Sequence, residues 1–222
     1  MGRDDTPARQ RHPGRVNRSG RRQLLVAGLA SLAVPAWAQR MLLTPAQTEG
    51  PFYPDRMPTD QDADLTTVAG RSGRARGEAG LLSGRVLDAS GKPLSGVRVE
   101  IWQCDANGRY LHSADRNGTP DPDFQGFGAA SSGEDGAWRF RTIRPVAYPG
   151  RTPHIHFKLV RRGTHLLTTQ MYIAGHPQNE RDGLFRSVDR AGQQALSAAF
   201  EQDGAGWQAR WDIVLGVTPP QA

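Results

Sequence analysis

Two segments of alternating polarity, joined by a turn, constrain the fold of this chain more than any other feature. Residues 82–87 (LSGRVL) and residues 97–102 (VRVEIW) alternate in side-chain character along their length. Successive side chains of a β-strand point to opposite faces, so each segment as a strand presents one apolar face. Residues 88–93 (DASGKP), which lie between the two segments, have the composition of a turn. The pattern predicts two consecutive strands that bury one face against other structure.

Further strand patterns follow along the rest of the chain. Residues 138–142 place their aromatic side chains on one face. Residues 156–160 and 166–173 could form a hairpin across residues 161–164, and residues 207–216 read as a closing strand. The number of such segments indicates a fold that consists mainly of β-strands.

Composition supports a β protein with many loops. The 222 residues include 26 Gly and 16 Pro, and 37% are hydrophobic, which suits such a fold better than a helical bundle. The one convincing helical pattern covers residues 191–200. We therefore predict an all-β fold, an antiparallel β-sandwich with long loops and one short C-terminal helix. Its first two strands and their turn resemble the opening of a transthyretin-like (prealbumin-like) sandwich.

The N-terminal residues read as an export signal. Residues 1–22 are rich in arginine, residues 24–34 form a short apolar run, and Ala36-Trp37-Ala38 offers a cleavage site with small residues at both specificity positions. The run is too short to span a membrane comfortably, which takes about 20 apolar residues. Arg21-Arg22 resembles the twin-arginine motif, although Gly20 stands where a serine or threonine is usual. We expect cleavage after Ala38 and a periplasmic protein without a transmembrane span. The alternative is a basic tail followed by a membrane anchor.

The positive charge of the chain is concentrated in that N-terminal segment. The formal net charge is +6, but residues 1–38 hold seven arginines against two aspartates, a net of +5, so the remainder carries +1. An almost neutral mature protein gives no electrostatic reason to expect nucleic-acid binding. Cys104 is the single cysteine, so no internal disulfide can form, and we expect it to be a small buried hydrophobe.

A pair of histidines marks a candidate metal site. His154 and His156 lie in residues 153–160, which read as a strand, so both imidazoles point to one face and Ile155 to the other. Imidazole binds Zn, Cu, Fe and Ni, so the two histidines alone leave the metal open. The plain alternative is two histidines on the solvent face of a strand.

Two tyrosines, Tyr110 and Tyr148, complete a donor set that narrows the choice of metal. Free tyrosine loses its proton only near pH ~10, so a highly charged metal ion is needed to bind it as phenolate. Two phenolates and a hydroxide supply the three negative charges that neutralise a ferric ion. Without such a metal, Tyr110 would be read as an amphipathic residue at a sandwich edge.

Several motifs occur together and in order. They are residues 48–54 (TEGPFYP), 84–110, 144–149 (RPVAYP), 151–157 (RTPHIHF) and 169–172 (TQMY). With these motifs the chain resembles the intradiol ring-cleavage dioxygenases, non-haem ferric enzymes that open catechols between their two hydroxyls, and in particular the subunits of protocatechuate 3,4-dioxygenase. The matching stretches span about residues 45 to 175.

The resemblance implies roles for individual residues. It implies Fe(III) as cofactor, held by Tyr110, Tyr148, His154 and His156. Tyr148 would be the ligand that leaves iron when substrate binds and takes a proton from it, and the proline after it favours an extended backbone.

Three further elements of the site follow from the same resemblance. Arg151 would lie over the substrate ring and stabilise negative charge on carbon, a role that suits a cation that keeps its proton. Gln170 would hold Arg151 in place. Tyr53, Gly50 and Pro51 would line the substrate pocket.

The implied reaction uses a catechol and O2 and gives a cis,cis-muconate-type product without a reducing cofactor. Relatives often assemble, so the resemblance also points to a homo-oligomer. The link between Tyr148 and His154 is shorter than in protocatechuate dioxygenase subunits, which leaves the ring substituent of the substrate open. We expect three parts: residues 1–38 as signal peptide, residues 39–80 as an extended, irregular segment that lines the site, and residues 81–222 as the dioxygenase sandwich.

Three other classes of protein would require different features of the chain. A transthyretin-like binding module without activity predicts that the tyrosines and histidines do not converge. A secreted zinc hydrolase needs a third carboxylate or histidine ligand and an open water site. An Fe(II) extradiol enzyme needs two histidines and a carboxylate.

Overall fold

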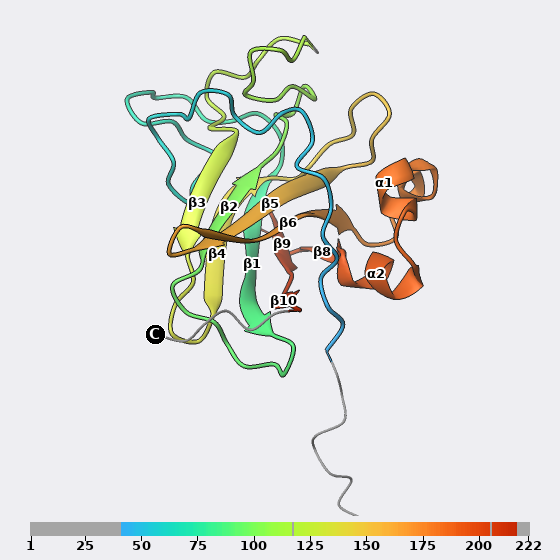
Figure 1. Ribbon diagram of the computed structural model, residues 1–222. Coiled ribbons are helices and arrows are strands. Elements are labelled where there is room, and N and C mark those ends of the chain that lie inside the picture. Colours follow the sequence, from blue (N-terminus) through green and yellow to red (C-terminus); the bar gives the residue numbers. More distant parts are fainter. Residues whose placement is uncertain (1–40, 117, 205, 217–222) are drawn as a thin grey trace, which may run out of the picture. The chain divides into compact units, whose positions relative to one another are not determined.

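The first of two β-sheets is arranged around strand β1 (Ala79–Asp88). In the computed structural model, which describes residues 41–116, 118–204 and 206–216, β1 pairs antiparallel with one strand and parallel with two others (Figure 1). The antiparallel partner is β4 (Ala137–Ile143), and the parallel partners are β9 (Trp207–Arg210) and β10 (Ile213–Leu215). A short strand, β8 (Phe200–Gln202), pairs antiparallel with β9 at the edge. All these residues belong to one unit of the chain, Trp37–Ala222.

The closing strand expected at residues 207–216 is interrupted between β9 and β10. The register is continuous, since Ser83 pairs with Arg210 and Val86 with Ile213. Between these pairs, the backbone N–H of Arg85 donates to the carboxylate of Asp212 at 2.9 Å. The Asp212 side chain thus replaces a backbone carbonyl of the sheet ladder at this point, so β9 ends before Asp212 and β10 begins after it.

The second sheet contains the predicted hairpin. Its strand order is β3 (Phe127–Ser131), β2 (Arg98–Trp102), β5 (His154–Arg161), β6 (Thr164–Ile173) and β7 (Ser197–Ala198). The pairs are antiparallel except for β6 with β7. Arg162 and Gly163 connect β5 to β6, both with positive φ (51° and 77°), as a type I′ hairpin turn requires.

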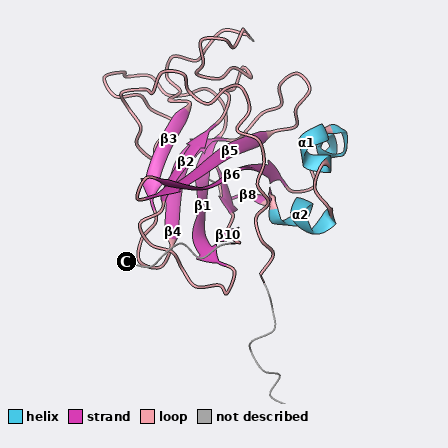
Figure 2. Ribbon diagram, viewed as in Figure 1, coloured by secondary structure: helices cyan, strands magenta, loops and turns pink. Residues whose placement is uncertain are grey.

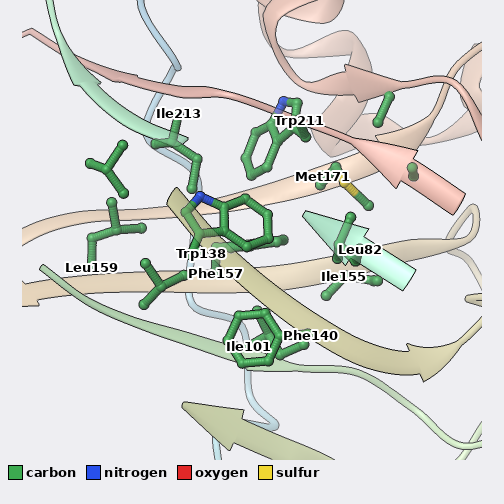
Figure 3. Packing of buried hydrophobic residues seen from close by; sticks show 14 of the residues in the cluster. Leu82, Ile101, Trp138, Phe140, Ile155, Phe157, Leu159, Met171, Trp211 and Ile213 are labelled. Atoms are coloured by element: carbon green, nitrogen blue, oxygen red, sulfur yellow. The ribbon is translucent and has the colours of Figure 1, made fainter. Parts of the chain in front are cut away.

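The apolar faces of the two sheets pack against each other and form the main core. Figure 3 shows Leu82 of β1 and Phe140 of β4 in one cluster with Ile101, Ile155 and Met171 of the second sheet. Leu65 enters the same core from the irregular N-terminal segment and is fully buried. The structure confirms the all-β sandwich, with two mixed sheets in place of purely antiparallel ones.

The helix expected at residues 191–200 is wrong in extent. The helix observed there, α2, covers Arg190–Ala195. Beyond it, Ser197 pairs with Tyr172 of β6, and the Tyr172 N–H donates to the Leu196 carbonyl at 2.8 Å, so sheet pairing replaces the helix. Two helical turns were not expected: a 3₁₀-helix, η1 (Pro177–Arg181), and α1 (Gly183–Arg186). Figure 2 shows strands and loops in the rest of the described chain.

Residues 41–78 run along both sheets as loops. Their backbone N–H groups bond to sheet carbonyls, for example Thr44 to Val214 and Gln47 to Thr168. This path, drawn from blue to teal in Figure 1, brings residues 47–53 to one end of β5 and β6. Among the described residues, no helix is long and apolar enough to cross a membrane. The predicted signal peptide, residues 1–38, lies outside the described residues.

Candidate active site

The two histidines lie at the start of β5, on the face of the second sheet that points away from the main core. Ile155 between them is fully buried in that core, as the strand alternation predicts. His154 and His156 are themselves 1% and 2% exposed, because loops cover their face of the sheet. Their Nε2 atoms are 3.1 Å apart. The Thr152 carbonyl lies 2.6 Å from Nδ1 of His154, which leaves Nε2 of that ring directed at the other donors.

Tyr110 reaches the histidines from the long loop between β2 and β3. The carboxylate of Asp105 accepts the backbone N–H groups of Asn107, Arg109 and Asp121, and Asp115 accepts the N–H of Tyr110 at 2.7 Å. Carboxylates that bond nearby backbone groups hold such loops in one conformation. The phenol oxygen of Tyr110 is thereby 3.3 Å from Nε2 of His154, and the residue is 2% exposed.

Tyr148 is presented by a tight turn. Its carbonyl accepts the N–H of Arg151 at 2.9 Å, with Pro149 and Gly150 between them and φ of +82° at Gly150. Proline followed by a residue of positive φ is the signature of a type II turn. The ring of Tyr148 lies 5.5 Å from the rings of both Tyr110 and His154. The structure thus brings together all four residues that the sequence singled out as ligands.

The four donor groups suit a cation. Burial, helped by the charge of Arg151, lowers the pKa of His154 to about 3, and burial also lowers the pKa of His156, so both imidazoles are neutral. Burial raises the pKa values of Tyr110 and Tyr148, so neither becomes a phenolate without a compensating positive charge. Within the described residues, no group of three or more His, Cys, Asp or Glu side chains could hold a metal ion. The donor set here therefore consists of two phenols and two imidazoles.

Arg151 is fixed beside this cluster by contacts on three sides. Its Nε donates to Asp182 at 2.8 Å, one terminal nitrogen donates to Gln170 and to the Tyr172 hydroxyl, and the other donates to the Tyr148 hydroxyl at 3.4 Å. Burial opposes its charge, but the hydrogen bond to Asp182 raises the pKa of Arg151, so the guanidinium stays charged. The expected contact between Gln170 and Arg151 is present.

Trp102 is a site residue that sequence reasoning did not assign. In the sheet register Trp102 pairs with His156, and His156 pairs with Gln170, so the three side chains form a row across β2, β5 and β6. The indole lies flat on the His156 ring, 4.8 Å between centroids and 13° from parallel. Strand alternation placed Trp102 on the face opposite to Val99 and Ile101. The histidine pair, which lies on the neighbouring strand β5, was the signal that could have linked Trp102 to the site.

The segment 50–53 covers the cluster from the other side. Gly50 faces His156, since a Cβ at Gly50 would lie 3.4 Å from Cε1 of that ring. Pro51 is exposed. Phe52, which sequence reasoning did not single out, stacks on Tyr110 with 5.0 Å between ring centroids. An aromatic side chain thus closes the cluster on its loop side.

Tyr53 lies behind Trp102, away from the four donor atoms. Its ring meets Trp102 edge to face, 5.0 Å between centroids, and its hydroxyl donates to Glu100 at 2.9 Å. The ammonium of Lys158 lies 4.2 Å from the centroid of the Tyr53 ring. The structure therefore does not bring the Tyr53 hydroxyl to the other candidate residues, and substrate contact by Tyr53 stays a prediction.

Two cavities border the cluster. One of about 360 Å³ lies against Tyr110 and the loop around it, next to His112 and Phe124. The other, of about 190 Å³, lies between the Tyr148–Arg151 turn and helix η1 and includes Asp182. One donor tyrosine lines each cavity, Tyr110 the first and Tyr148 the second.

Comparison with known proteins identifies the class of this site. The family model Dioxygenase_C, described as dioxygenase, matches residues 48–217, which include every candidate site residue above. The chain belongs to the intradiol ring-cleavage dioxygenases, enzymes that open a catechol ring between its two hydroxyls.

Individual relatives agree with that family. The chain is similar to the protocatechuate 3,4-dioxygenase beta chain of Burkholderia cepacia, 40% identical over 169 residues, which cover 69% of this chain and 71% of the relative. It is 32% identical over 124 residues to catechol 1,2-dioxygenase of Candida albicans, which cover 48% of this chain and 40% of that relative. The dioxygenase domain of a carbohydrate-binding fusion protein from Streptomyces sp. SirexAA-E has a similar structure, with TM-score 0.62, 35% identity, and coverage of 79% and 99%.

Proposed function

We propose that this chain is an Fe(III) dioxygenase that opens a catechol-type aromatic ring between its two hydroxyls with O2 and gives a cis,cis-muconate-type product. The observation that carries the proposal is the convergence of the donor atoms. The Tyr110 oxygen and the His156 Nε2 lie 3.3 Å and 3.1 Å from the His154 Nε2, in a site where none of the four ring groups is charged by itself. Bound ferric iron would supply a Lewis acid that holds both substrate oxygens and makes the catecholate reactive towards O2.

The donors fit ferric iron in detail. Phenolate oxygens favour a highly charged ion, and the bond of Thr152 to Nδ1 of His154 fixes which nitrogen of that ring binds. Nδ1 of His156 has no hydrogen-bond partner among the described residues, so the Trp102 stack, in place of a polar contact, orients that ring. Zinc would be a poorer match, since its sites in proteins use Cys, His, Asp and Glu.

The two tyrosines have different environments, which supports different roles. Tyr110 is buried under Phe52 and held by its loop, whereas Tyr148 is half-buried at the start of a turn. Burial raises the pKa of Tyr148, while Arg151 opposes the rise. Tyr110 therefore suits a permanent ligand, and Tyr148 suits the residue that turns away when substrate arrives and accepts one of its hydroxyl protons.

Arg151 supplies fixed positive charge beside the reacting ring. A charged group that is already oriented stabilises developing negative charge without reorganisation, an effect worth a few kcal/mol, about 3 in measured cases. Gln170 and Tyr172 hold one edge of the guanidinium in place. The other edge faces Tyr148, the ligand that we expect to move.

The substrate class follows from what the relatives have in common. Their names specify protocatechuate, catechol and hydroxyquinol, which share two adjacent ring hydroxyls and differ in the rest of the ring. We propose a catechol-type substrate and O2 as partners, and assembly into a homo-oligomer. We also propose that residues 1–38 direct export to the periplasm, which N-terminal sequencing of the secreted protein would test through cleavage after Ala38.

Turnover in labelled oxygen tests the reaction. Iron-loaded protein is given catechol, protocatechuate or hydroxyquinol under ¹⁸O2, and the product is analysed by mass spectrometry. The proposal expects a ring-opened dicarboxylic acid with both atoms of O2 and no need for a reductant. His154→Ala should abolish turnover, whereas His165→Ala, at an exposed position on β6, should not. Binding of catechols without turnover by the iron-loaded protein would instead support a binding module.

A further inference from the structure

Asp182 stands where helix η1, helix α1 and the link between Tyr148 and His154 meet, and it has no role in the function proposed so far. It ends helix η1 and caps the N-terminus of α1, and its side chain is fully buried. One carboxylate oxygen, Oδ1, accepts the backbone N–H groups of Leu184 and Phe185, both at 3.0 Å. The other, Oδ2, accepts Nε of Arg151 at 2.8 Å and the backbone N–H of Thr152 at 3.0 Å.

The two oxygens have separable tasks. Capping the four-residue helix α1 requires only Oδ1. Oδ2 instead binds two successive residues about thirty positions earlier in the chain, Arg151 and Thr152. These residues lie in the short link that begins at the Tyr148 turn and ends at His154. The second oxygen therefore ties the link to α1.

The contact with Asp182 determines the orientation of the Arg151 side chain. A guanidinium is planar, so anchoring two of its nitrogens fixes the direction of the third. Asp182 anchors Nε, and Gln170 anchors one terminal nitrogen. The remaining nitrogen then points at the Tyr148 hydroxyl, 3.4 Å away.

Charge gives Asp182 a second effect on the same residue. The Arg151 side chain is 15% exposed, and apart from Asp182 its hydrogen-bond partners among the described residues are the uncharged side chains of Gln170, Tyr172 and Tyr148, so its desolvation is costly unless an anion is paired with it. The ion pair with Asp182 provides that anion, on the side of the guanidinium away from Tyr148. The ion pair with Asp182 thus offsets the cost of burying the Arg151 cation, while the guanidinium nitrogen that faces Tyr148 takes no part in that ion pair.

We propose that Asp182 is a positioning residue for the ring-opening reaction, which acts through Arg151 by fixing the plane of its guanidinium and pairing its charge. This inference rests on the function proposed above. It assigns catalytic importance to a residue on the η1–α1 junction, outside the strands and loops that carry the ligands and Arg151.

Asp182→Asn tests the inference. Asparagine caps helices about as well as aspartate, so the cap on α1 is retained while the charge is lost. In the iron-loaded enzyme with catechol as probe, kcat should fall on the order of 100-fold, as expected for a misplaced catalytic group, with KM, iron content and visible spectrum much less affected. Asp189→Asn is the matched control, because Asp189 caps α2 through Gly192 in the same way and is exposed.

A double-mutant cycle separates positioning from mere structural support. In an Arg151→Ala background, Asp182→Asn should cause no further loss of kcat, because the residue through which it acts is gone. An independent further loss, or a single-variant kcat within twofold of that of Asp189→Asn, would overturn the inference. If Asp182→Asn does not fold, Asp182→Glu is taken through the same cycle. Urea unfolding of the wild type, the two single variants and the double variant measures the coupling of Asp182 and Arg151 even if the wild type does not turn over catechol. Additive losses of unfolding free energy in these four proteins would also overturn the inference.

Discussion

The indole of Trp102 lies flat against the imidazole of His156, 4.8 Å between ring centroids and 13° from parallel. The two residues are direct cross-strand neighbours on β2 and β5. Nδ1 of His156 has no hydrogen-bond partner among the described residues, so the flat stack on Trp102 constrains the plane of that ring where no hydrogen bond to Nδ1 does so.

Replacing Trp102 should therefore weaken the binding of iron. In Trp102→Phe we expect iron to be lost to a chelator about 10-fold faster, the low end of the effect seen when groups that orient metal ligands are removed. Trp138→Phe is the control, because Trp138 is also buried but packs in the main core against Phe157. Equal rates of iron loss in the two variants would contradict the role of the stack.

Tyr53 should matter for stability more than for substrate binding. Its hydroxyl donates to Glu100, a carboxylate that is 7% exposed, so Tyr53→Phe removes a hydrogen bond to a buried charged group. We expect a loss of about 2 kcal/mol in the free energy of unfolding, measured by urea denaturation, and an unchanged KM for catechol. A raised KM with unchanged stability would instead support the substrate contact predicted from the sequence.

Gln103 links the two sheets and should be costly to replace. It is fully buried, its amide donates to the Ile143 carbonyl at 3.1 Å, and its oxygen accepts the Thr142 hydroxyl at 2.9 Å. Gln103→Leu removes both hydrogen bonds and should cost about 3 kcal/mol, whereas Thr142→Val removes one of them and should cost about 1 kcal/mol. Urea unfolding followed by tryptophan fluorescence measures both, and similar losses would contradict this account.

The metal-free protein should be sensitive to acid. Burial lowers the folded-state pKa of His154 to about 3, while an unfolded histidine titrates near ~6.5, so between these values the unfolded chain binds more protons. The free energy of unfolding should therefore fall as pH falls from about 6.5 towards 3. His154→Leu should weaken this pH dependence and His165→Gln should not, because His165 is exposed. An equal slope of unfolding free energy against pH in all three proteins would contradict the prediction.

Local patterns were enough to predict part of this site. Alternation along residues 153–160 places His154 and His156 on one face and Ile155 in the core, since a strand has a period of two. The Tyr148-Pro149-Gly150-Arg151 turn was not predicted, although it is also encoded locally, by proline and glycine at the two central positions. Donor chemistry made Tyr110 and Tyr148 candidates beside the histidines, but their ligand roles came from the family resemblance, because no local pattern distinguishes a ligand tyrosine from an edge tyrosine.

Contacts between distant segments account for what was missed. Trp102 contacts His156 because of the register between β2 and β5, and Asp182 contacts Arg151 about thirty residues earlier in the chain. The periodicity of a sequence segment does not encode either contact. The helix expected at residues 191–200 ends at Ala195 because β6 pairs with the residues that follow. Tertiary pairing overrides local propensity there.

The visible absorption spectrum of the iron-loaded mature protein tests the central claim most directly. Tyr110 and Tyr148 as phenolate ligands predict a charge-transfer band that colours the protein red and shifts when catechol is added without oxygen. The band should be absent in the Tyr110→Phe, Tyr148→Phe double variant. It should be unchanged in Tyr53→Phe, because the Tyr53 hydroxyl donates to Glu100 and does not face the donor atoms. A colourless protein that takes up no iron on reconstitution would contradict the ferric site and the ring-opening function that depends on it.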